Sequence, residues 1–150
     1  MINLLDLSLI VTELKTPNNC PSFGGRFFKT VPDDDLTIDE HESPVGFIYL
    51  ADDDSDDNQA AGNRSVIQRT ESHFMIELAI RRTLTKTDKF DDASVDLIRQ
   101  YRTEIFTALI GKRLGACIKP IRHVNGKLKK KEARLIKWAD IFTTDNIITG

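Results

Sequence analysis

Apolar residues recur along the chain at spacings that predict two helices. From Ile2 to Leu14 they form a stripe at near-helical spacing among polar residues, which predicts a short amphipathic helix ending before Pro17. A second stripe follows Asp91-Asp92, which can cap a helix, and stops at Gly111, a common C-terminal residue. The second stripe consists of Val95, Ile98, Tyr101 or Arg102, Ile105 and Leu109.

Three stretches between these helices have the patterns of strands. Phe23 to Val31 contains a glycine pair, and Val45 to Leu50 is short, aromatic and β-branched. The clearest strand lies within Ser65 to Thr83, where apolar and polar residues alternate. Its apolar face holds Phe74, Ile76, Leu78 and Ile80, and its other face holds Glu77 and Arg81.

The end of the chain predicts a β-hairpin. Ala116 to Val124 leads to Asn125-Gly126, the dipeptide best suited to a type I′ turn. On the return strand Ile136, Trp138 and Phe142 take alternate positions. We expect Trp138 and Phe142 to face a core shared with Ile105 and Leu109, because the helix stripe needs a sheet to bury against. The order of elements predicts an α+β fold: a mostly antiparallel sheet packed against two helices, with a C-terminal β-hairpin, as a single domain over 1–150.

Composition agrees with one ordinary globular domain. Apolar residues make up 40% and charged residues 29% of the 150 residues. No apolar run approaches the length of a membrane span, and the N-terminus lacks the basic region of a secretory signal. Cys20 and Cys117 lie far apart without CxxC spacing, so we expect reduced thiols in a cytosolic protein.

Charge is distributed very unevenly along the chain. Residues 33–57 hold eleven acids and no Lys or Arg, whereas residues 112–137 hold ten Lys or Arg and one acid, Glu132. This asymmetry is typical of a protein whose acidic face meets the basic face of a partner, including another copy of itself.

No set of residues converges on a catalytic or cofactor site. His41, His73 and His123 lack HxxxH or HExxH spacing and are not near a cysteine, so we expect no zinc site. Gly24-Gly25 lacks the spacing of a phosphate loop, and no GxSxG occurs. The acids cluster in predicted loops rather than on rigid elements that could fix two carboxylates. We therefore expect a protein that is not an enzyme and needs no cofactor.

The acidic stretch 52–62 has a metal-binding alternative. It contains Asp52, Asp53, Asp54, Asp56 and Asp57 and no large apolar residue. Hard cations prefer carboxylate oxygens, but the acids are consecutive and the twelfth position is Asn63 rather than the glutamate of a calcium hand. We expect a mobile surface loop rather than a metal site.

The basic stretch Lys127 to Lys131 has a nucleic-acid-binding alternative. Clustered lysines neutralise phosphates, but the whole chain is acidic and no aromatic residue interleaves with these lysines. A solvated turn and a contact with an acidic protein surface remain the other interpretations.

The order of elements from Ser65 onward resembles the phage tail terminator and tail completion proteins. In that family an alternating strand opens with a polar pair like Gln68-Arg69 and ends in a basic residue, here Arg81. An Asp-rich helix start follows, and the helix closes on an Ala-Leu-x-Gly pattern, here Ala108 to Gly111. The match covers about the C-terminal half of the chain.

The remaining motifs continue this resemblance with one departure. A hairpin with a glycine turn, here Asn125-Gly126, leads to a tryptophan and then Phe-Thr-Thr, here Trp138 and Phe142 to Thr144. The family often has Gly-Trp-x-Pro after the helix, whereas this chain has Gly-Lys-Arg-Leu at 111–114.

The resemblance implies a structural virion protein that assembles in the host cytoplasm. It implies a homo-oligomeric ring, commonly of six subunits, that sits on the tail tube protein, stops its polymerisation and offers a docking surface to head-tail connector or neck proteins. Heterologous contacts around a closing axis generate such rings. The tail sheath is a further candidate partner, DNA would pass only in transit, and no membrane is involved.

We expect the subunit contacts at the two charged stretches, with the DNA channel or an adjacent ring as the alternative that either stretch faces. A small nucleic-acid-binding factor that uses 127–131 is the alternative function, and an enzyme with an acid-based metal site ranks below it. The candidate interface residues are Asp52, Asp53, Asp54, Asp56, Asp57, Lys127, Lys129, Lys130 and Lys131.

Overall fold

Two helices and a five-stranded sheet make up the described part of the chain. The computed structural model describes residues 4–33, 38, 42–55, 67–81, 92–115, 119–132 and 134–149. The strand order is β1-β2-β3-β5-β4, and all neighbouring strands are antiparallel apart from β1 and β2, so the predicted α+β fold is confirmed. The elements are α1 (Leu7–Lys15), β1 (Phe27–Phe28), β2 (Val45–Ser55), β3 (Ile67–Arg81), α2 (Asp92–Leu109), β4 (Arg122–Lys131) and β5 (Leu135–Thr149), with a 3-10 turn at Pro21–Phe23.

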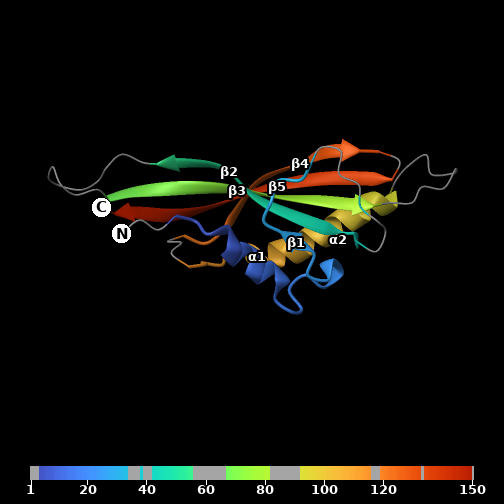
Figure 1. Cartoon of the computed structure of the whole chain (residues 1–150), viewed down its shortest axis with the longest axis horizontal. Helices are drawn as coiled ribbons and strands as arrows, with labels where there is room; N and C mark the ends of the chain where they lie inside the picture. Colours follow the sequence, from blue (N-terminus) through green and yellow to red (C-terminus); the bar gives the residue numbers. More distant parts are fainter. Residues whose placement is uncertain are drawn as a thin grey trace.

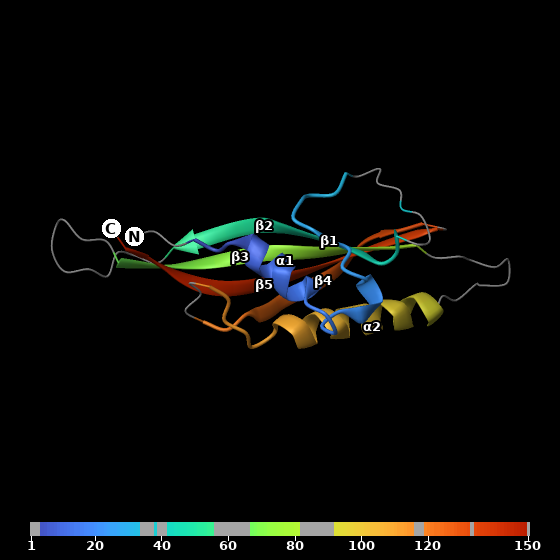
Figure 2. The ribbon, with the colours of Figure 1, turned by 60° about the horizontal axis from the view of Figure 1, so that its bottom comes forward.

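Both helices pack on one face of the sheet, which we call the helix face (Figures 1 and 2). The predicted alternation in β3 builds the centre of this core, because all four apolar residues of its stripe are buried there. Ile10 and Leu14 of α1 and Ile105 and Leu109 of α2 cover them. Phe142 of β5 is fully buried and stacks on Phe74 with ring centroids 5.5 Å apart.

A smaller core lies on the opposite face. Val45, Phe47, Ala79 and Leu135 come together there with Ile38. The register agrees with this placement: Val45 pairs with Ala79, and Ile48 pairs with Ile76 of the helix face. These two pairs are an odd number of residues apart, so they point to opposite faces. The segment after β1 therefore crosses to the far side of the sheet.

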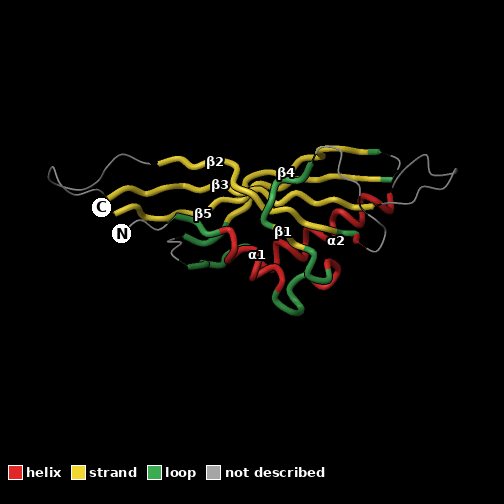
Figure 3. Tube along the Cα trace, in the orientation of Figure 1, coloured by secondary structure: helices red, strands yellow, loops and turns green. Residues whose placement is uncertain are grey.

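The long strands extend past the helices as an arm (Figure 3). β3 and β5 pair along their whole lengths, from Ile67 with Thr149 to Arg81 with Leu135. The arm consists of the end of β2, the start of β3 and the end of β5. On its helix face Thr144 donates a hydrogen bond to the carbonyl oxygen of Lys119 at 2.8 Å, so the segment before β4 covers part of the arm.

The hairpin turn lies elsewhere than predicted. Asn125-Gly126 falls inside β4, and the chain reverses after Lys131, where the Glu132 amide donates to the Leu135 carbonyl oxygen at 2.8 Å. Packing accounts for the glycine, because a Cβ at Gly126 would come within 2.2 Å of Asp140 Oδ1. A close side-chain approach, rather than turn geometry, requires glycine here.

Several other predicted boundaries differ from the structure. α1 begins at Leu7 because Asp6 caps it, with the Ser8 amide donating to Asp6 Oδ1 at 2.9 Å. Only Phe27–Phe28 of the predicted strand 23–31 pairs with a neighbour. β4 starts at Arg122, so 119–121 of the predicted strand 116–124 do not belong to it, and 116–118 lie outside the described residues. Gly111, with φ +84°, ends α2 as predicted, whereas the predicted cap Asp91 lies outside the described residues.

Candidate functional site

The predicted basic stretch lies along an edge strand rather than at a hairpin tip. β4 pairs with β5 on one side, and no described strand pairs with its other side. Lys127 and Lys131 are exposed and form no ion pair within the described part of the chain. Lys130 pairs with Glu132 at 3.2 Å, and Lys129 Nζ lies 4.0 Å from Glu77 Oε1. The edge therefore keeps exposed positive charge, mainly at its two outer lysines.

The predicted acidic stretch begins on a strand. β2 continues to Ser55, so Asp52, Asp53 and Asp54 belong to it and the loop predicted for 52–62 is wrong over its first four residues. Asp56 and Asp57 lie outside the described residues. β1 pairs with the outer side of β2 only at Gly46 and Phe47. Beyond Phe47, no described strand pairs with this side of β2.

The acidic and basic groups occupy diagonally opposite corners of the sheet. Asp52 of β2 pairs with His73 of β3. Lys127 of β4 pairs with Ala139 of β5, which in turn pairs with Glu77 of β3, four residues from His73. With about 3.3 Å per residue along a strand and about 4.8 Å between strands, the backbone positions of Asp52 and Lys127 are about 20 Å apart. Ion pairs need about 4 Å between charged atoms, so this separation disfavours pairing of the two groups within one chain.

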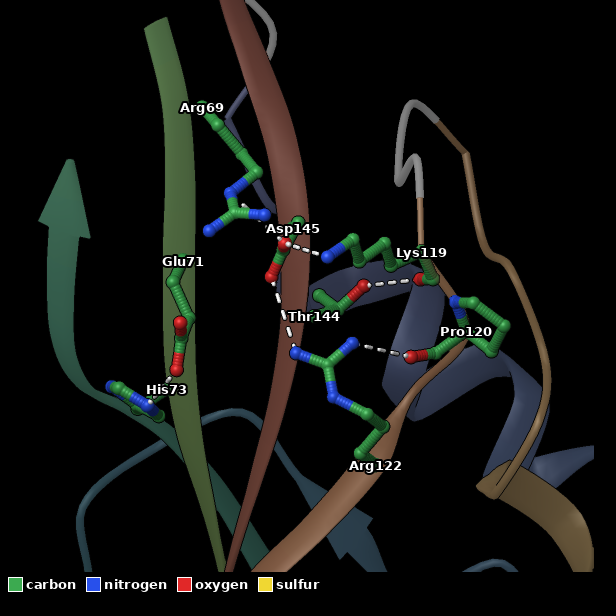
Figure 4. Close-up of polar contacts among 8 residues, drawn as sticks. All are labelled: Arg69, Glu71, His73, Lys119, Pro120, Arg122, Thr144 and Asp145. Carbon is green, nitrogen blue, oxygen red and sulfur yellow. Dashed lines mark hydrogen bonds and ion pairs between the residues drawn. The ribbon is translucent and has the colours of Figure 1, made fainter. Parts of the chain in front are cut away.

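A buried aspartate on the arm gathers three cations (Figure 4). Asp145 of β5 is 1% exposed, and Arg69 of β3, Lys119 and Arg122 of β4 lie 3.4, 3.5 and 3.3 Å from its oxygens. Each of these cations is roughly two-fifths exposed. Glu71, opposite Asp145 in the register, contacts His73 at 2.9 Å instead. One buried carboxylate therefore anchors three side chains whose charge reaches the surface.

A second buried aspartate joins α2 to the sheet. Asp140 of β5 is 3% exposed and accepts hydrogen bonds from Arg102 at 2.9 and 3.1 Å. Trp138 Nε1 donates to it at 3.1 Å, and His123 Nε2 lies 2.9 Å from it. The Arg102 guanidinium also sits over the Trp138 ring, 4.7 Å from its centroid. The contacts of this cluster all lie within the chain and link α2 to β4 and β5.

An apolar groove of about 290 Å³ separates the start of α2 from the β4 edge. Trp138 lies in this groove and is only half-buried, so the prediction that it joins Phe142 in the core is wrong. Val95 and Leu128 line the groove with exposed fractions of 64% and 49%. Basic side chains from both walls, Arg99, Arg102 and Lys131, complete the lining.

Sequence reasoning missed the two aspartate clusters and the exposed leucines of the edges. Asp140 and Asp145 interrupt a strand of mostly apolar or small residues, in which Lys137 and Asn146 are the other polar exceptions, and such interruptions are the signal that buried, paired carboxylates leave in a sequence. Leu50 and Leu128, 48% and 49% exposed, left no such signal, because an edge position depends on strand order.

The titratable and metal-ligating side chains of the described residues take part in packing and ion pairs. In the described ranges no three His, Cys, Asp or Glu side chains come together as a metal site, and no described helix is long and apolar enough to cross a membrane. Burial raises the pKa of the Cys20 thiol to about 12, with Glu104 adding to the effect. Burial, followed by the charge of Glu77, also raises the pKa of Tyr49, which donates a hydrogen bond to Glu77 Oε1 at 3.2 Å. Both groups are thus held in their protonated, unreactive forms.

One comparison with known proteins supports the fold, and another shows the family. A solved structure described as the virion of a native gene transfer agent particle superimposes with a TM-score of 0.58 at 13% sequence identity, covering 95% of this chain and 93% of the other. No curated protein matches the sequence. The family model described as phage tail terminator protein matches residues 1–150, the whole chain. The chain therefore belongs to the phage tail terminator family and is a structural protein of the phage tail.

Proposed function

We propose that this protein is a non-enzymatic subunit of a ring, commonly of six copies, that caps the tail tube and offers the docking surface for the head-tail connector or neck proteins. The family assignment supports the tail location, and the similar solved structure belongs to a virion particle. Assembly takes place in the host cytoplasm. The tube protein is the partner below the ring, a sheath is a further candidate partner, and DNA passes through the centre.

The ring proposal rests on where the acids of β2 and the lysines of β4 lie in the sheet. Acids at the end of β2 and lysines along β4 lie at opposite corners of the sheet, about 20 Å apart, so they are placed to meet between copies. Contacts between two different patches are heterologous, and they produce a ring when the rotation closes. Opposite charge on the two patches orients the copies head to tail.

The particle mass in solution and negative-stain images test the ring. Light scattering should give several times the 17.0 kDa of one chain, and negative-stain images should show rings with a central hole. A mass of one chain at every protein concentration would count against the ring. A salt-dependent gel shift by a one-chain species would instead favour the nucleic-acid-binding factor.

A binding experiment tests the capping role separately. Gold-labelled rings mixed with tubes of the tail tube protein should decorate tube ends, and tubes grown in their presence should be shorter. Rings that bind along the tube wall, or do not bind tubes, would contradict a terminator role while leaving the ring in place.

A further inference from the structure

Both edges of the described sheet are open. Within the described residues, no strand pairs with the outer backbone groups of these edges. These are β4, from Arg122 to Lys131, and the part of β2 beyond Phe47, up to Ser55. An open edge is a template for pairing with another chain, so proteins protect it or use it. The two edges differ in charge: β4 contains the lysines of 127–131, and β2 contains Asp52 to Asp54.

This charge difference selects between the possible edge contacts. Two β4 edges would bring lysines against lysines, and two β2 edges would bring aspartates against aspartates, and like charges across strands destabilise pairing. A β2 edge against a β4 edge brings opposite charges together. Each edge is therefore best matched by the edge of opposite charge on another copy.

We propose that the open edge of β2 in one copy pairs with the open edge of β4 in the next, so that the sheet continues from subunit to subunit. The proposal rests on the ring proposed above and adds its contact. Strand directions alternate along β2, β3, β5 and β4, so β2 of a copy in the same orientation lies antiparallel to β4. The occupant of each edge is therefore a second copy of this chain.

The side chains favour one register. Side chains on one face of β2 must meet side chains on the same face of β4 when the two edges pair between copies, which restricts the register. Leu50 lies on the helix face, opposite the core residue Phe74, and Leu128 lies on the helix face, opposite Trp138. The face-matched register places Leu50 of one copy directly opposite Leu128 of the next.

This register buries exposed apolar surface and brings charged positions together. Leu50 and Leu128 are each about half-exposed in the single chain. After the irregularity between Leu50 and Asp52, the Asp52 position pairs with His73 on the face opposite the helices, and Lys127, opposite Ala139, belongs to that face too. The Asp52 position of one copy thus comes beside Lys127 of the next. The apolar pair and the charged pair lie on opposite faces of the same junction.

Cysteine cross-linking between separate chains tests this contact. In a Cys117→Ser background, with Cys20 buried, one chain carries Leu50→Cys and the other Leu128→Cys. Their Cβ atoms lie three strands apart within one chain, beyond disulfide reach. Disulfide-linked dimers should form when the two variants are mixed, and neither variant alone should form them. A matched mixture of Leu50→Cys with Ile110→Cys, an exposed residue after α2, should also give none.

Hydrogen exchange provides the second measurement. Alternate amides of 48–55 and 122–131, those that point away from β3 and β5, should exchange about tenfold or more slowly in the ring than in the dilute monomer. A ring without mixed dimers and without this protection would overturn the edge pairing but leave the proposed function standing. Dimers of Leu128→Cys alone would also overturn it, because β4 would then pair with itself. A protein that stays monomeric would overturn both proposals.

Discussion

Arg102 of α2 donates two hydrogen bonds to Asp140 of β5, from Nη2 at 2.9 Å and from Nε at 3.1 Å. The carboxylate is 3% exposed and also receives the indole N–H of Trp138. The pair therefore fixes α2 over the β5 and β4 end of the sheet, beside the groove and the basic edge. The proposed interface depends on this internal contact for its shape.

Asp140→Ala should lower the free energy of unfolding by about 3–5 kcal/mol, since it leaves Arg102 and Trp138 Nε1 without their acceptor. Asp140→Asn keeps one acceptor oxygen and should cost less. Urea unfolding of the two variants beside the parent chain measures both values. Equal, small losses would mean that the cluster contributes little to the fold.

The two aromatic residues of β5 should respond differently to truncation. Phe142 is fully buried in the main core, so Phe142→Ala should cost about 3–5 kcal/mol through lost burial and a cavity. Trp138 is half-buried in the groove, so Trp138→Ala should cost about 1–3 kcal/mol, from its hydrogen bond and its stacking with Arg102. Thermal and urea unfolding compare them. A greater loss for Trp138 would place it in the core after all.

Gly126→Ala should destabilise the fold even though a strand ordinarily tolerates alanine. Its Cβ would meet Asp140 Oδ1 at 2.2 Å and Arg102 Nη2 at 3.0 Å, so the buried cluster must shift. Forcing atoms into a packed site typically costs about 1–3 kcal/mol. Asn125→Ala, at the exposed neighbouring position, is the matched control and should be nearly neutral. Equal stabilities for the two variants would favour the turn that the dipeptide alone predicts.

Stability should fall in alkaline solution. The raised pKa values of Cys20 and Tyr49 mean that the unfolded chain releases these protons at lower pH than the folded chain. The free energy of unfolding then decreases as pH rises from about 9 towards about 12, the range between the two pKa values of Cys20. Unfolding measured across this range checks the slope, and Cys20→Ala should reduce it, leaving the part that Tyr49 contributes. Stability that stays level would contradict the buried, protonated thiol.

The main elements of the fold were predictable because long strands and helices carry strong periodic patterns. The alternation from Phe74 to Ile80 predicted β3, and the helical stripe ending at Gly111 predicted α2. Short or irregular elements were not predictable in the same way. β1 is only two residues long, and Asn125-Gly126 carries a turn signal that tertiary packing against Asp140 overrides.

The charged residues of the candidate site could be predicted from the sequence, but their positions in the sheet could not. Runs of acids and lysines are visible in sequence, so Asp52 to Asp54 and Lys127 to Lys131 could be chosen from it. Their position on two edges of one sheet depends on the order β1-β2-β3-β5-β4, which arises from long-range pairing. The same limit hid Leu50 and Leu128, because exposed leucines look like core residues in a sequence.

Reversal of the basic edge should prevent assembly without unfolding the chain. Lys127, Lys129 and Lys130 changed to Glu would make the β4 edge acidic where Lys127 lies beside the Asp52 position of the next copy, so the two edges would repel, most strongly at low salt, where screening is weakest. Lys15, Lys29 and Arg113, which lie outside β4 and β2, changed to Glu provide the matched control with the same change in net charge. Light scattering at low and high salt compares the two variants. The control should still form rings.

Mixing two charge-reversed chains tests most directly whether the ring forms by acidic edges meeting basic edges. One chain carries the three Lys→Glu changes, and the other carries Asp52, Asp53 and Asp54 changed to Lys. Neither should assemble alone, since each junction would join like charges. Mixed in equal amounts, they should form alternating rings, because every junction then joins opposite charges. Light scattering that shows full-size rings from either variant alone, or only single chains from the mixture, would contradict head-to-tail assembly through these two edges.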